Sequence, residues 1–317
     1  MCCAETLAVR VVAARWEAEK VTSFEFASHD GTELPSWEAG AHIDVHLPSG
    51  TVRQYSLCGD PAERTRYRIA VLELPDGRGG SVEAHRELRP GQIIEIGMPR
   101  SNFALIDADR YVFVAGGIGI TPILPMVREV TARGIKWELR YGAKSLKHFA
   151  FAGELASDST HLVAQDTDGL IDLDAVVTDS AGAAVYCCGP APLMDALVER
   201  MGAVGRGDDL YLERFGAAPA ASAVTTDVGA FEVELARSEM VISVQPDQSV
   251  LEAVREAGVD HPSSCEMGFC GTCETPVVSG DVDHRDDLFT EAERATCASM
   301  LICVSRSKGC SRLVLDI

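Results

Sequence analysis

A group of cysteines near the C-terminus has the clearest chemical meaning in this sequence. Cys265, Cys270 and Cys273 follow the spacing C-x4-C-x2-C, and Cys303 comes later in the chain. Four thiolates with this spacing hold the two irons of a plant-type [2Fe-2S] cluster. Glycines between the cysteines allow a tight loop whose backbone amides turn toward the cluster sulfurs. The spacing therefore predicts a [2Fe-2S] centre, which accepts and releases single electrons.

A structural zinc site is the alternative use of the same four cysteines. Zinc sites usually combine two short cysteine pairs, whereas here three ligands share one loop, which favours the iron–sulfur cluster. The fourth ligand has to be chosen from three later cysteines. Cys303 lies in the apolar, strand-like run MLICVS and can point inward, while Cys297 and Cys310 have polar neighbours. We predict Cys303 as the ligand and the other two as incidental thiols.

A glycine-rich turn in the middle of the chain suits the binding of a pyrophosphate. The segment GGIGITP follows the apolar strand YVFVA and precedes a helical pattern. Bare backbone at a helix N-terminus lets phosphate oxygens approach the amide groups. The spacing departs from the GxGxxG of Rossmann domains, and a turn without a ligand is the alternative. The predicted nucleotide contacts are Gly116, Gly117, Gly119, Thr121 and Pro122, of which the last two set the first helical turn.

Two shorter motifs in the first hundred residues indicate a further phosphate-bearing ligand. The segment GGS opens the helical stretch SVEAHREL, so amides and a hydroxyl gather at a helix N-terminus. The strand-like segment RQYSL offers an arginine for a phosphate, a flat aromatic face and a small hydroxyl. Each motif alone is also compatible with ordinary structure. The residues concerned are Arg53, Tyr55, Ser56, Gly79, Gly80 and Ser81.

The elements that must position these residues fall into three domains, so the fold class is multidomain α/β and β. Alternating short strands in residues 1–103 predict an antiparallel β-barrel. Residues 104–216 begin with a continuous apolar strand and a helix, which predicts a parallel α/β sheet. An Ala-, Ser- and Thr-rich stretch predicts a linker at 217–228. Residues 229–317 then start with two alternating strands and one amphipathic helix before the cysteines.

Composition restricts the environment and the partners. The chain of 317 residues has a formal net charge of −20, which argues against a nucleic-acid partner because phosphate binding needs a basic surface. The acidic surface could steer a basic protein partner, or could simply keep the protein in solution. No stretch is apolar enough to span a membrane, and the first residues do not resemble a secretory signal. We therefore expect a cytoplasmic protein with no membrane contact.

The motifs and their order together resemble the phthalate dioxygenase reductase family, which includes the vanillate demethylase reductases, over essentially the whole chain. The resemblance implies a flavin-binding barrel, a ferredoxin-reductase-type nucleotide domain and a C-terminal β-grasp ferredoxin domain. It also implies that Tyr55 packs on the isoalloxazine ring, that Ser56 approaches the flavin N5, and that the GGS turn binds the phosphate. The family implies FMN as the flavin, with FAD the less favoured alternative.

Two further segments acquire roles through this resemblance. Cys188 and Gly189, in the segment CCGP that precedes Met194, resemble the family's CGP segment, whose strand end lies beside the nicotinamide. Phe215, in the segment ERF, resembles the residue that closes the nucleotide domain and covers the flavin until the nicotinamide displaces it. For both segments, ordinary core residues are the alternative.

The choice between NADH and NADPH depends on the charges after the second and third strands of the nucleotide domain. A 2′-phosphate would need basic residues, and Lys144 and Lys147 are available. Asp166 and Asp168 would disfavour a phosphate if they line the adenosine ribose. Because the family favours NADH, we predict NADH.

The predicted function is electron transfer from NADH through FMN and the [2Fe-2S] cluster to the Rieske centre of a partner oxygenase or demethylase. A flavin is needed because a nicotinamide gives up two electrons together, whereas the cluster accepts one at a time. One alternative is the same chemistry with a diiron or haem monooxygenase as acceptor. A non-enzymatic redox sensor is a further alternative, but it would need neither Ser56 nor the glycine turns.

Overall fold

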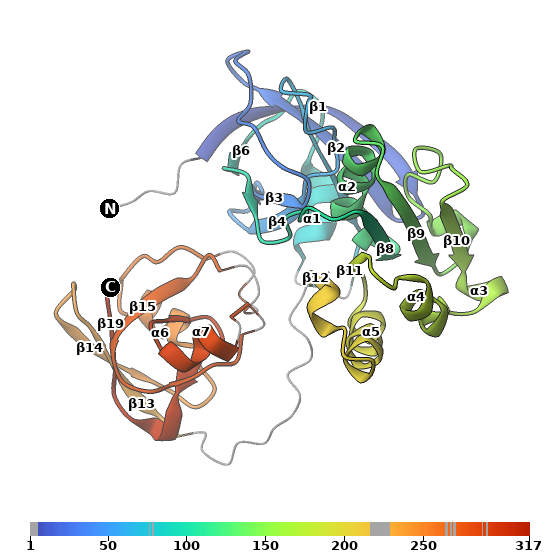
Figure 1. Ribbon diagram of the computed structural model, residues 1–317. Coiled ribbons are helices and arrows are strands. Elements are labelled where there is room, and N and C mark those ends of the chain that lie inside the picture. Colours follow the sequence, from blue (N-terminus) through green and yellow to red (C-terminus); the bar gives the residue numbers. More distant parts are fainter. Residues whose placement is uncertain are drawn as a thin grey trace. The chain divides into compact units, whose positions relative to one another are not determined.

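The computed structural model describes residues 6–75, 77, 79–215, 229–263, 266, 268, 271–286, 288–289 and 291–317. The chain divides into two compact units, Met1–Arg214 and Phe215–Ile317 (Figure 1). The predicted linker 217–228 and two of the predicted cluster ligands, Cys265 and Cys270, lie outside the described residues. Among the described residues, no helix is long and apolar enough to cross a bilayer.

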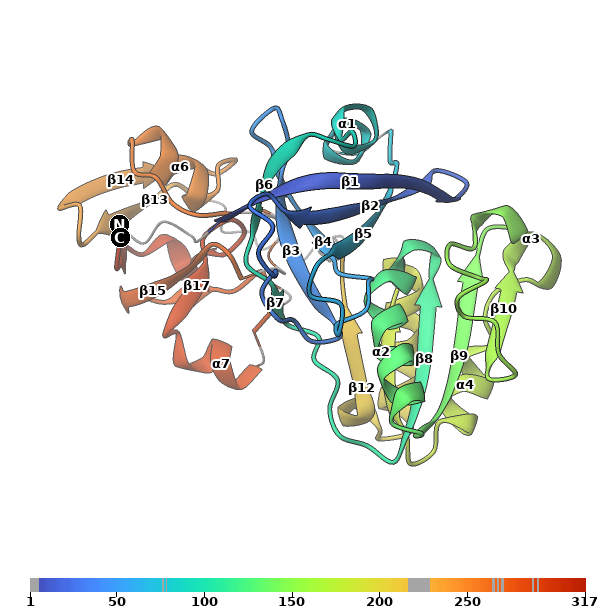
Figure 2. The ribbon, with the colours of Figure 1, turned by 90° about the horizontal axis from the view of Figure 1, so that it is seen from above.

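The first unit begins with the predicted antiparallel barrel (Figure 2). Its strands follow the order β4-β3-β6-β1-β2-β5, and a bridge between Leu57 and Ile69 joins the two ends. Alternate side chains, such as Phe24 and Phe26, fill the interior and are almost completely buried. The elements are β1 (Thr6–Ala18), β2 (Val21–Ser28), β3 (Ala41–His46), β4 (Val52–Ser56), β5 (Tyr67–Leu72), α1 (Gly80–Glu87), β6 (Ile93–Gly97) and β7 (Arg100–Ser101), which pairs with β3.

A five-stranded parallel sheet follows, with the strand order β10-β9-β8-β11-β12. Helices cover both of its faces, so β8 is buried on both sides: Phe113 packs in the core beneath α2, and Val112 and Val114 pack in the core beneath α4 and α5. This explains the continuous apolar run in the sequence. The elements are β8 (Arg110–Gly116), η1 (Gly117–Gly119), α2 (Ile120–Ala132), β9 (Lys136–Ala143), η2 (Leu146–His148), β10 (Thr160–Ala164), α3 (Gln165–Asp168), α4 (Leu173–Asp179), β11 (Ala184–Cys188), α5 (Ala191–Ala203), η3 (Gly207–Asp209) and β12 (Leu210–Glu213).

The barrel and the parallel sheet form one unit because they share a hydrophobic core. Ala18, Val21 and Ala70 of the barrel belong to the same buried cluster as Phe113 and Leu124 of the sheet layer. The sequence predicts two domains that meet at residue 103, and that boundary stays a prediction.

The second unit contains a mixed sheet with the order β14-β13-β19-β15-β17, in which β19 runs parallel to β13. The predicted hairpin and helix are confirmed, and a capping box of Ser249 and Glu252 begins the helix. Val250 and Val254 of this helix are buried in the core of the unit. The elements are β13 (Phe231–Leu235), β14 (Met240–Val244), α6 (Val250–Glu256), β15 (Glu274–Ser279), β16 (Val282–Asp283), α7 (Glu291–Thr296), β17 (Ser299–Leu301), β18 (Arg306–Ser307), η4 (Lys308–Cys310) and β19 (Leu313–Leu315).

Candidate cofactor sites

The two glycine motifs of the nucleotide domain meet at the carboxyl ends of adjacent strands. β8 and β11 are neighbours, and Cys188 pairs with Ala115. A Cβ atom on Gly119 would lie 2.2 Å from the carbonyl oxygen of Cys188, and one on Gly116 would lie 2.6 Å from Cδ of Pro190. A side chain at position 119 would collide with backbone, and one at position 116 would collide with the proline ring, so both positions favour glycine.

The site lies where the strand order reverses direction, between β8 and β11. In open parallel sheets, this crevice is where nucleotides bind. Gly117 has φ of +55°, and Thr121 Oγ1 donates a hydrogen bond to the Ile118 carbonyl at 2.9 Å. Pro122 is buried in the first turn of α2. The turn therefore ends in a helix N-terminus whose amides are suited to a pyrophosphate.

A serine from the barrel and a glutamate from the parallel sheet meet beside this crevice. Ser56, at the end of β4, is 5% exposed, and its Oγ lies 3.5 Å from Oε2 of Glu213, at the end of β12. Glu213 pairs in register with Cys188. Ser56 and Cys188, which the sequence singles out separately, are thus connected through Glu213. The sequence analysis included Glu213 only as part of the segment ERF and gave it no role of its own, although an acidic residue that ends a strand beside Phe215 was an available signal.

Burial controls the protonation of these groups. Desolvation raises the pKa of Glu213 to about 8, and the hydrogen bond from Ser56 opposes this only in part. Desolvation also raises the pKa of Cys188 well above its usual value, and the nearby Glu213 and Cys187 add to the effect. Cys188 is therefore a neutral thiol, suited to packing against a ligand and unsuited to nucleophilic attack.

The two motifs of the barrel also come together. A Cβ atom on Gly80 would lie 2.6 Å from Nε of Arg53, so the arginine side chain lies against the first residue of α1. Gly79, which precedes the helix, has φ of +81°. Arg53 Nη1 donates to the Val52 carbonyl at 2.8 Å. An arginine beside a helix N-terminus is a suitable phosphate site.

The other predicted flavin contacts are Ser81, Tyr55 and Phe215. The Ser81 hydroxyl accepts a hydrogen bond from the Leu74 amide at 3.0 Å, so its contact with a phosphate stays a prediction. Tyr55 packs against the barrel core, and desolvation raises its pKa to about 12, which keeps the phenol neutral. The side chain of Phe215 is 41% exposed and belongs to the second unit, so its contact with a flavin also stays a prediction.

The residues considered for the adenosine end lie after β9 and β10. Lys147 pairs with Glu19 at 3.9 Å, while Lys144 is exposed. The Asp168 carboxylate accepts a hydrogen bond from the Ala164 amide at 2.9 Å, which ties it to its own turn. Asp166 is exposed in the same short helix, α3.

At the other end of the predicted electron path, Cys273 and Cys303 are both buried in one hydrophobic cluster. The run MLICVS is a strand only as far as Leu301, so the expected strand position of Cys303 is wrong: it lies in the turn after β17. A Cβ atom on Gly268 would lie 2.6 Å from Val304 Cγ2. The predicted cluster loop thus approaches the residue next to Cys303, which fits a shared ligand set.

The two remaining candidate ligands have other surroundings. Cys297 is partly exposed, and its Sγ donates to the Arg294 carbonyl at 3.5 Å. A Cβ atom on Gly229 would lie 2.6 Å from Cys310 Sγ, so this thiol packs against the segment that leads into β13. These surroundings agree with the choice of Cys303, which stays a prediction.

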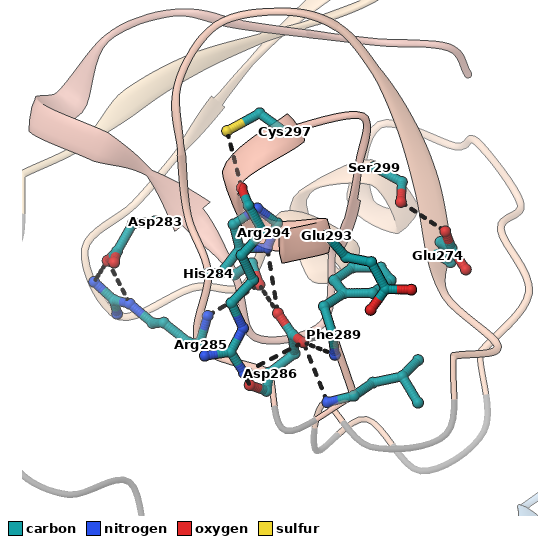
Figure 3. Close-up of polar contacts among 12 residues, drawn as sticks. Glu274, Asp283, His284, Arg285, Asp286, Phe289, Glu293, Arg294, Cys297 and Ser299 are labelled. Carbon is teal, nitrogen blue, oxygen red and sulfur yellow. Dashed lines mark hydrogen bonds and ion pairs between the residues drawn. The ribbon is translucent and has the colours of Figure 1, made fainter. Parts of the chain in front are cut away.

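A buried carboxylate, Asp286, gathers polar groups around it (Figure 3), and a Cβ atom on Gly268 would lie 3.1 Å from the Cα of Asp286. Its side chain is 0% exposed and accepts hydrogen bonds from the amides of residues 288–289, at 3.2 and 2.9 Å. His284 Nδ1 lies 3.3 Å and Ser305 Oγ 3.5 Å from Oδ2, and Arg294 lies 3.8 Å from Oδ1. Sequence reasoning missed this residue. Five groups from three segments satisfy one charge, which suits a structural role.

Comparisons with known proteins agree with this arrangement. The 2Fe-2S iron-sulfur cluster binding domain family matches residues 233–308. The chain is 40% identical to the vanillate O-demethylase oxidoreductase of Pseudomonas sp. (strain HR199 / DSM 7063), over 98% of this chain and 99% of the relative. It is 37% identical to the solved phthalate dioxygenase reductase, described as a modular structure for electron transfer from pyridine nucleotides to [2Fe-2S], with a TM-score of 0.73 over 98% of both chains.

A larger protein also contains a similar segment. An intact type IV self-sufficient cytochrome P450 monooxygenase is 39% identical, with a TM-score of 0.87, over 98% of this chain and 41% of that chain. The fold, the crevice and these matches define an oxidoreductase with a pyridine nucleotide domain and a [2Fe-2S] domain. The chain belongs to the phthalate dioxygenase reductase family.

Proposed function

We propose that the protein transfers electrons from NADH through FMN to its [2Fe-2S] cluster and then to the Rieske centre of a separate oxygenase. The observation that carries this proposal is the meeting of Ser56, Glu213 and Cys188 beside the nucleotide crevice. This arrangement brings the barrel motif and the nucleotide motif into one site. The named relative is a demethylase component, which supports an oxygenase system in aromatic catabolism as the setting.

The residues of the barrel fit a flavin mononucleotide. Arg53 and the N-terminus of α1 would hold the phosphate, and Ser56 would donate a hydrogen bond to the ring. Bound FMN would supply the conversion of a hydride into two single electrons. Tyr55 would contribute an uncharged aromatic face.

The chain's own residues control protons and water around this chemistry. Glu213 holds a proton on its carboxyl group at neutral pH, because its pKa lies at about 8. The neutral thiol of Cys188 would pack beside the nicotinamide and exclude water. The predicted role of Phe215 is to cover the flavin until the nicotinamide arrives.

NADH is the proposed donor, because Asp166 and Asp168 bring negative charge to the end of β10. Lys147, one of the two lysines that could attract a 2′-phosphate, already pairs with Glu19. The [2Fe-2S] ligands would be Cys265, Cys270, Cys273 and Cys303. A cytoplasmic location stays part of the proposal.

A haem monooxygenase is the second candidate acceptor, and one observation favours it. The match to a self-sufficient cytochrome P450 spans nearly the whole of this chain. In that protein the similar segment belongs to a longer chain. The match to the vanillate O-demethylase oxidoreductase covers 99% of that relative, compared with 41% of the P450 chain, which supports a separate acceptor protein.

One set of measurements tests the proposal. The flavin is extracted and identified by mass, and the purified protein is mixed with NADH or NADPH without oxygen. We expect FMN, rapid bleaching of the flavin by NADH, and then an electron paramagnetic resonance signal from the reduced cluster. Bleaching by NADPH alone, or the absence of bleaching, would contradict it. Electron delivery to a purified Rieske oxygenase and to a purified P450 haem domain decides between the two acceptors.

A further inference from the structure

An ion-pair cluster joins the two halves of the first unit. Glu154, in the loop between β9 and β10, makes two parallel contacts with Arg68 of β5, at 2.9 Å (Nη1–Oε1) and 3.0 Å (Nη2–Oε2). Arg128 of α2 contacts the same carboxylate through Nη2. Paired contacts between a planar guanidinium and a carboxylate fix both distance and orientation. One carboxylate therefore links an arginine of the barrel to an arginine of the nucleotide half.

The same two arginines also hold the backbone that follows β4. Arg68 Nη2 donates to the Cys58 carbonyl at 3.0 Å. Arg128 Nη1 donates to the Gly59 carbonyl at 2.7 Å and to the Cys58 carbonyl at 3.2 Å. Cys58 is completely buried, so its carbonyl needs a protein donor. We call Glu154, Arg68, Arg128 and the carbonyls of residues 58–59 the latch.

The segment that presents Glu154 is itself held in an unusual conformation. Phe151 has φ of +58°, which is rare for a bulky residue, and its side chain is 4% exposed. The Arg68 guanidinium lies 4.8 Å from the centre of the Phe151 ring. The Glu154 amide donates to the Phe151 carbonyl at 3.0 Å. Strained backbone persists only where surrounding contacts determine it, so the latch position is strongly fixed.

The latch is connected through short stretches of chain to both halves of the candidate site. Cys58 follows Ser56 by two residues. The latch therefore holds the end of the strand that carries the Ser56 hydroxyl, which is predicted to contact the flavin. Arg128 lies on α2, whose N-terminus follows the turn for the pyrophosphate. The contacts of Arg128 with residues 58–59 thus tie the segment that follows β4 to α2.

We propose that Glu154 is a positioning residue that sets the distance between the nicotinamide and the flavin. This rests on the proposed function. With both cofactors bound, NADH would supply a hydride, with both electrons of the broken C–H bond, and the flavin would accept it, giving NAD⁺ and reduced flavin. The latch makes no bond to either reactant. It acts because reacting atoms must lie within about 3 to 3.5 Å, and a displacement of about 1 Å can slow such a step by about 100-fold.

The test compares Glu154→Gln with the matched control Glu129→Gln. Both glutamates are similarly exposed, at 37% and 39%, and Glu129 pairs with Arg133 on α2 at 3.4 Å. Flavin reduction by NADH is followed by stopped-flow absorbance in the complete protein without oxygen. We expect the limiting rate of Glu154→Gln to fall at least about tenfold, while the Kd for NADH changes less than about threefold, and the control to match the wild type.

A second readout does not depend on turnover. Hydrogen–deuterium exchange of the complete protein without nucleotide should become faster in residues 57–60 and 149–155 of Glu154→Gln, and not in Glu129→Gln. The charge-transfer absorbance of the nicotinamide–flavin pair should weaken in the same variant. Arg128→Lys, which keeps the positive charge but cannot span both Glu154 and Gly59, should give the same result.

Several outcomes would overturn the proposal. The first is a limiting rate of flavin reduction in Glu154→Gln that equals the rate in Glu129→Gln. The second is a lower rate that the loss of bound flavin explains completely. If both latch variants unfold or lose flavin, the latch serves stability alone and the positioning role is wrong. Failure of the proposed function looks different, because the wild type itself would then not be reduced by NADH.

Discussion

Replacing Glu213 with glutamine removes a carboxyl group that desolvation keeps protonated at neutral pH. Its pKa rises from 4.5 to about 8 in the folded protein. The folded state therefore binds more protons than the unfolded state between these two values, and the stability linked to Glu213 is lost as the pH rises through this window. Glutamine does not titrate, so the variant should escape this loss.

The size of the effect follows from the shift. At about 1.4 kcal/mol per pH unit, a shift from 4.5 to about 8 corresponds to roughly 5 kcal/mol. Glu213 retains some solvent-accessible surface. Solvent screening therefore reduces this free energy, and we expect a contribution of about 2 kcal/mol. As the pH rises from 5 to 8.5, the free energy of unfolding of Glu213→Gln should increase by about 2 kcal/mol relative to that of the wild type.

The assay is urea unfolding at both pH values, with Glu199→Gln, an exposed glutamate on α5, as the control. Infrared difference spectra provide a direct check, because a protonated carboxyl band should disappear with a midpoint near pH 8 in the wild type and be absent from Glu213→Gln. A stability difference that does not change with pH, together with no carboxyl band above pH 6, would refute the reasoning.

Three further changes have clear expectations. Gly119→Ala places a Cβ atom 2.2 Å from the Cys188 carbonyl, so it should cost about 3 kcal/mol in urea unfolding and weaken NADH binding in a titration; unchanged binding would contradict the predicted turn. Asp286→Asn removes the charge shared by five groups and should lower stability by about 2 kcal/mol, with faster loss of iron to a chelator than in Asp281→Asn. Cys303→Ser should lose iron on purification while Cys297→Ser keeps it, and the reverse result would reassign the fourth ligand.

Features that depend on local sequence were predictable. The two-sided burial of β8 follows from its continuous apolar run, and the helix after it follows from the spacing of apolar residues. The glycines of the nucleotide turn were also recognisable, because a strand, a turn and a helix follow each other directly. The α6 helix was marked by its amphipathic pattern.

Features that depend on contacts between distant segments were not predictable. The need for glycine at position 119 arises from the Cys188 carbonyl, which is brought close only by the pairing of β8 with β11. Ser56 meets Glu213 across 157 positions in the sequence. Asp286 looks like one of many surface acids until three separate segments are folded around it. These contacts join residues from segments that are far apart in the sequence, so the residues around each partner do not reveal the other.

The energy of the last electron transfer does not select the acceptor. A plant-type cluster near about −400 mV delivers to a Rieske centre at about −150 mV or above, a drop of about 250 mV and roughly four decades in the equilibrium constant. Any acceptor with a reduction potential of about −150 mV or above would be reduced as readily. Recognition must therefore reside in the surface that meets the partner. From Val228 onward the sequence has 16 Asp and Glu against 7 Lys and Arg, so a partner with a basic docking face would be drawn to it and would form the encounter complex faster at low salt.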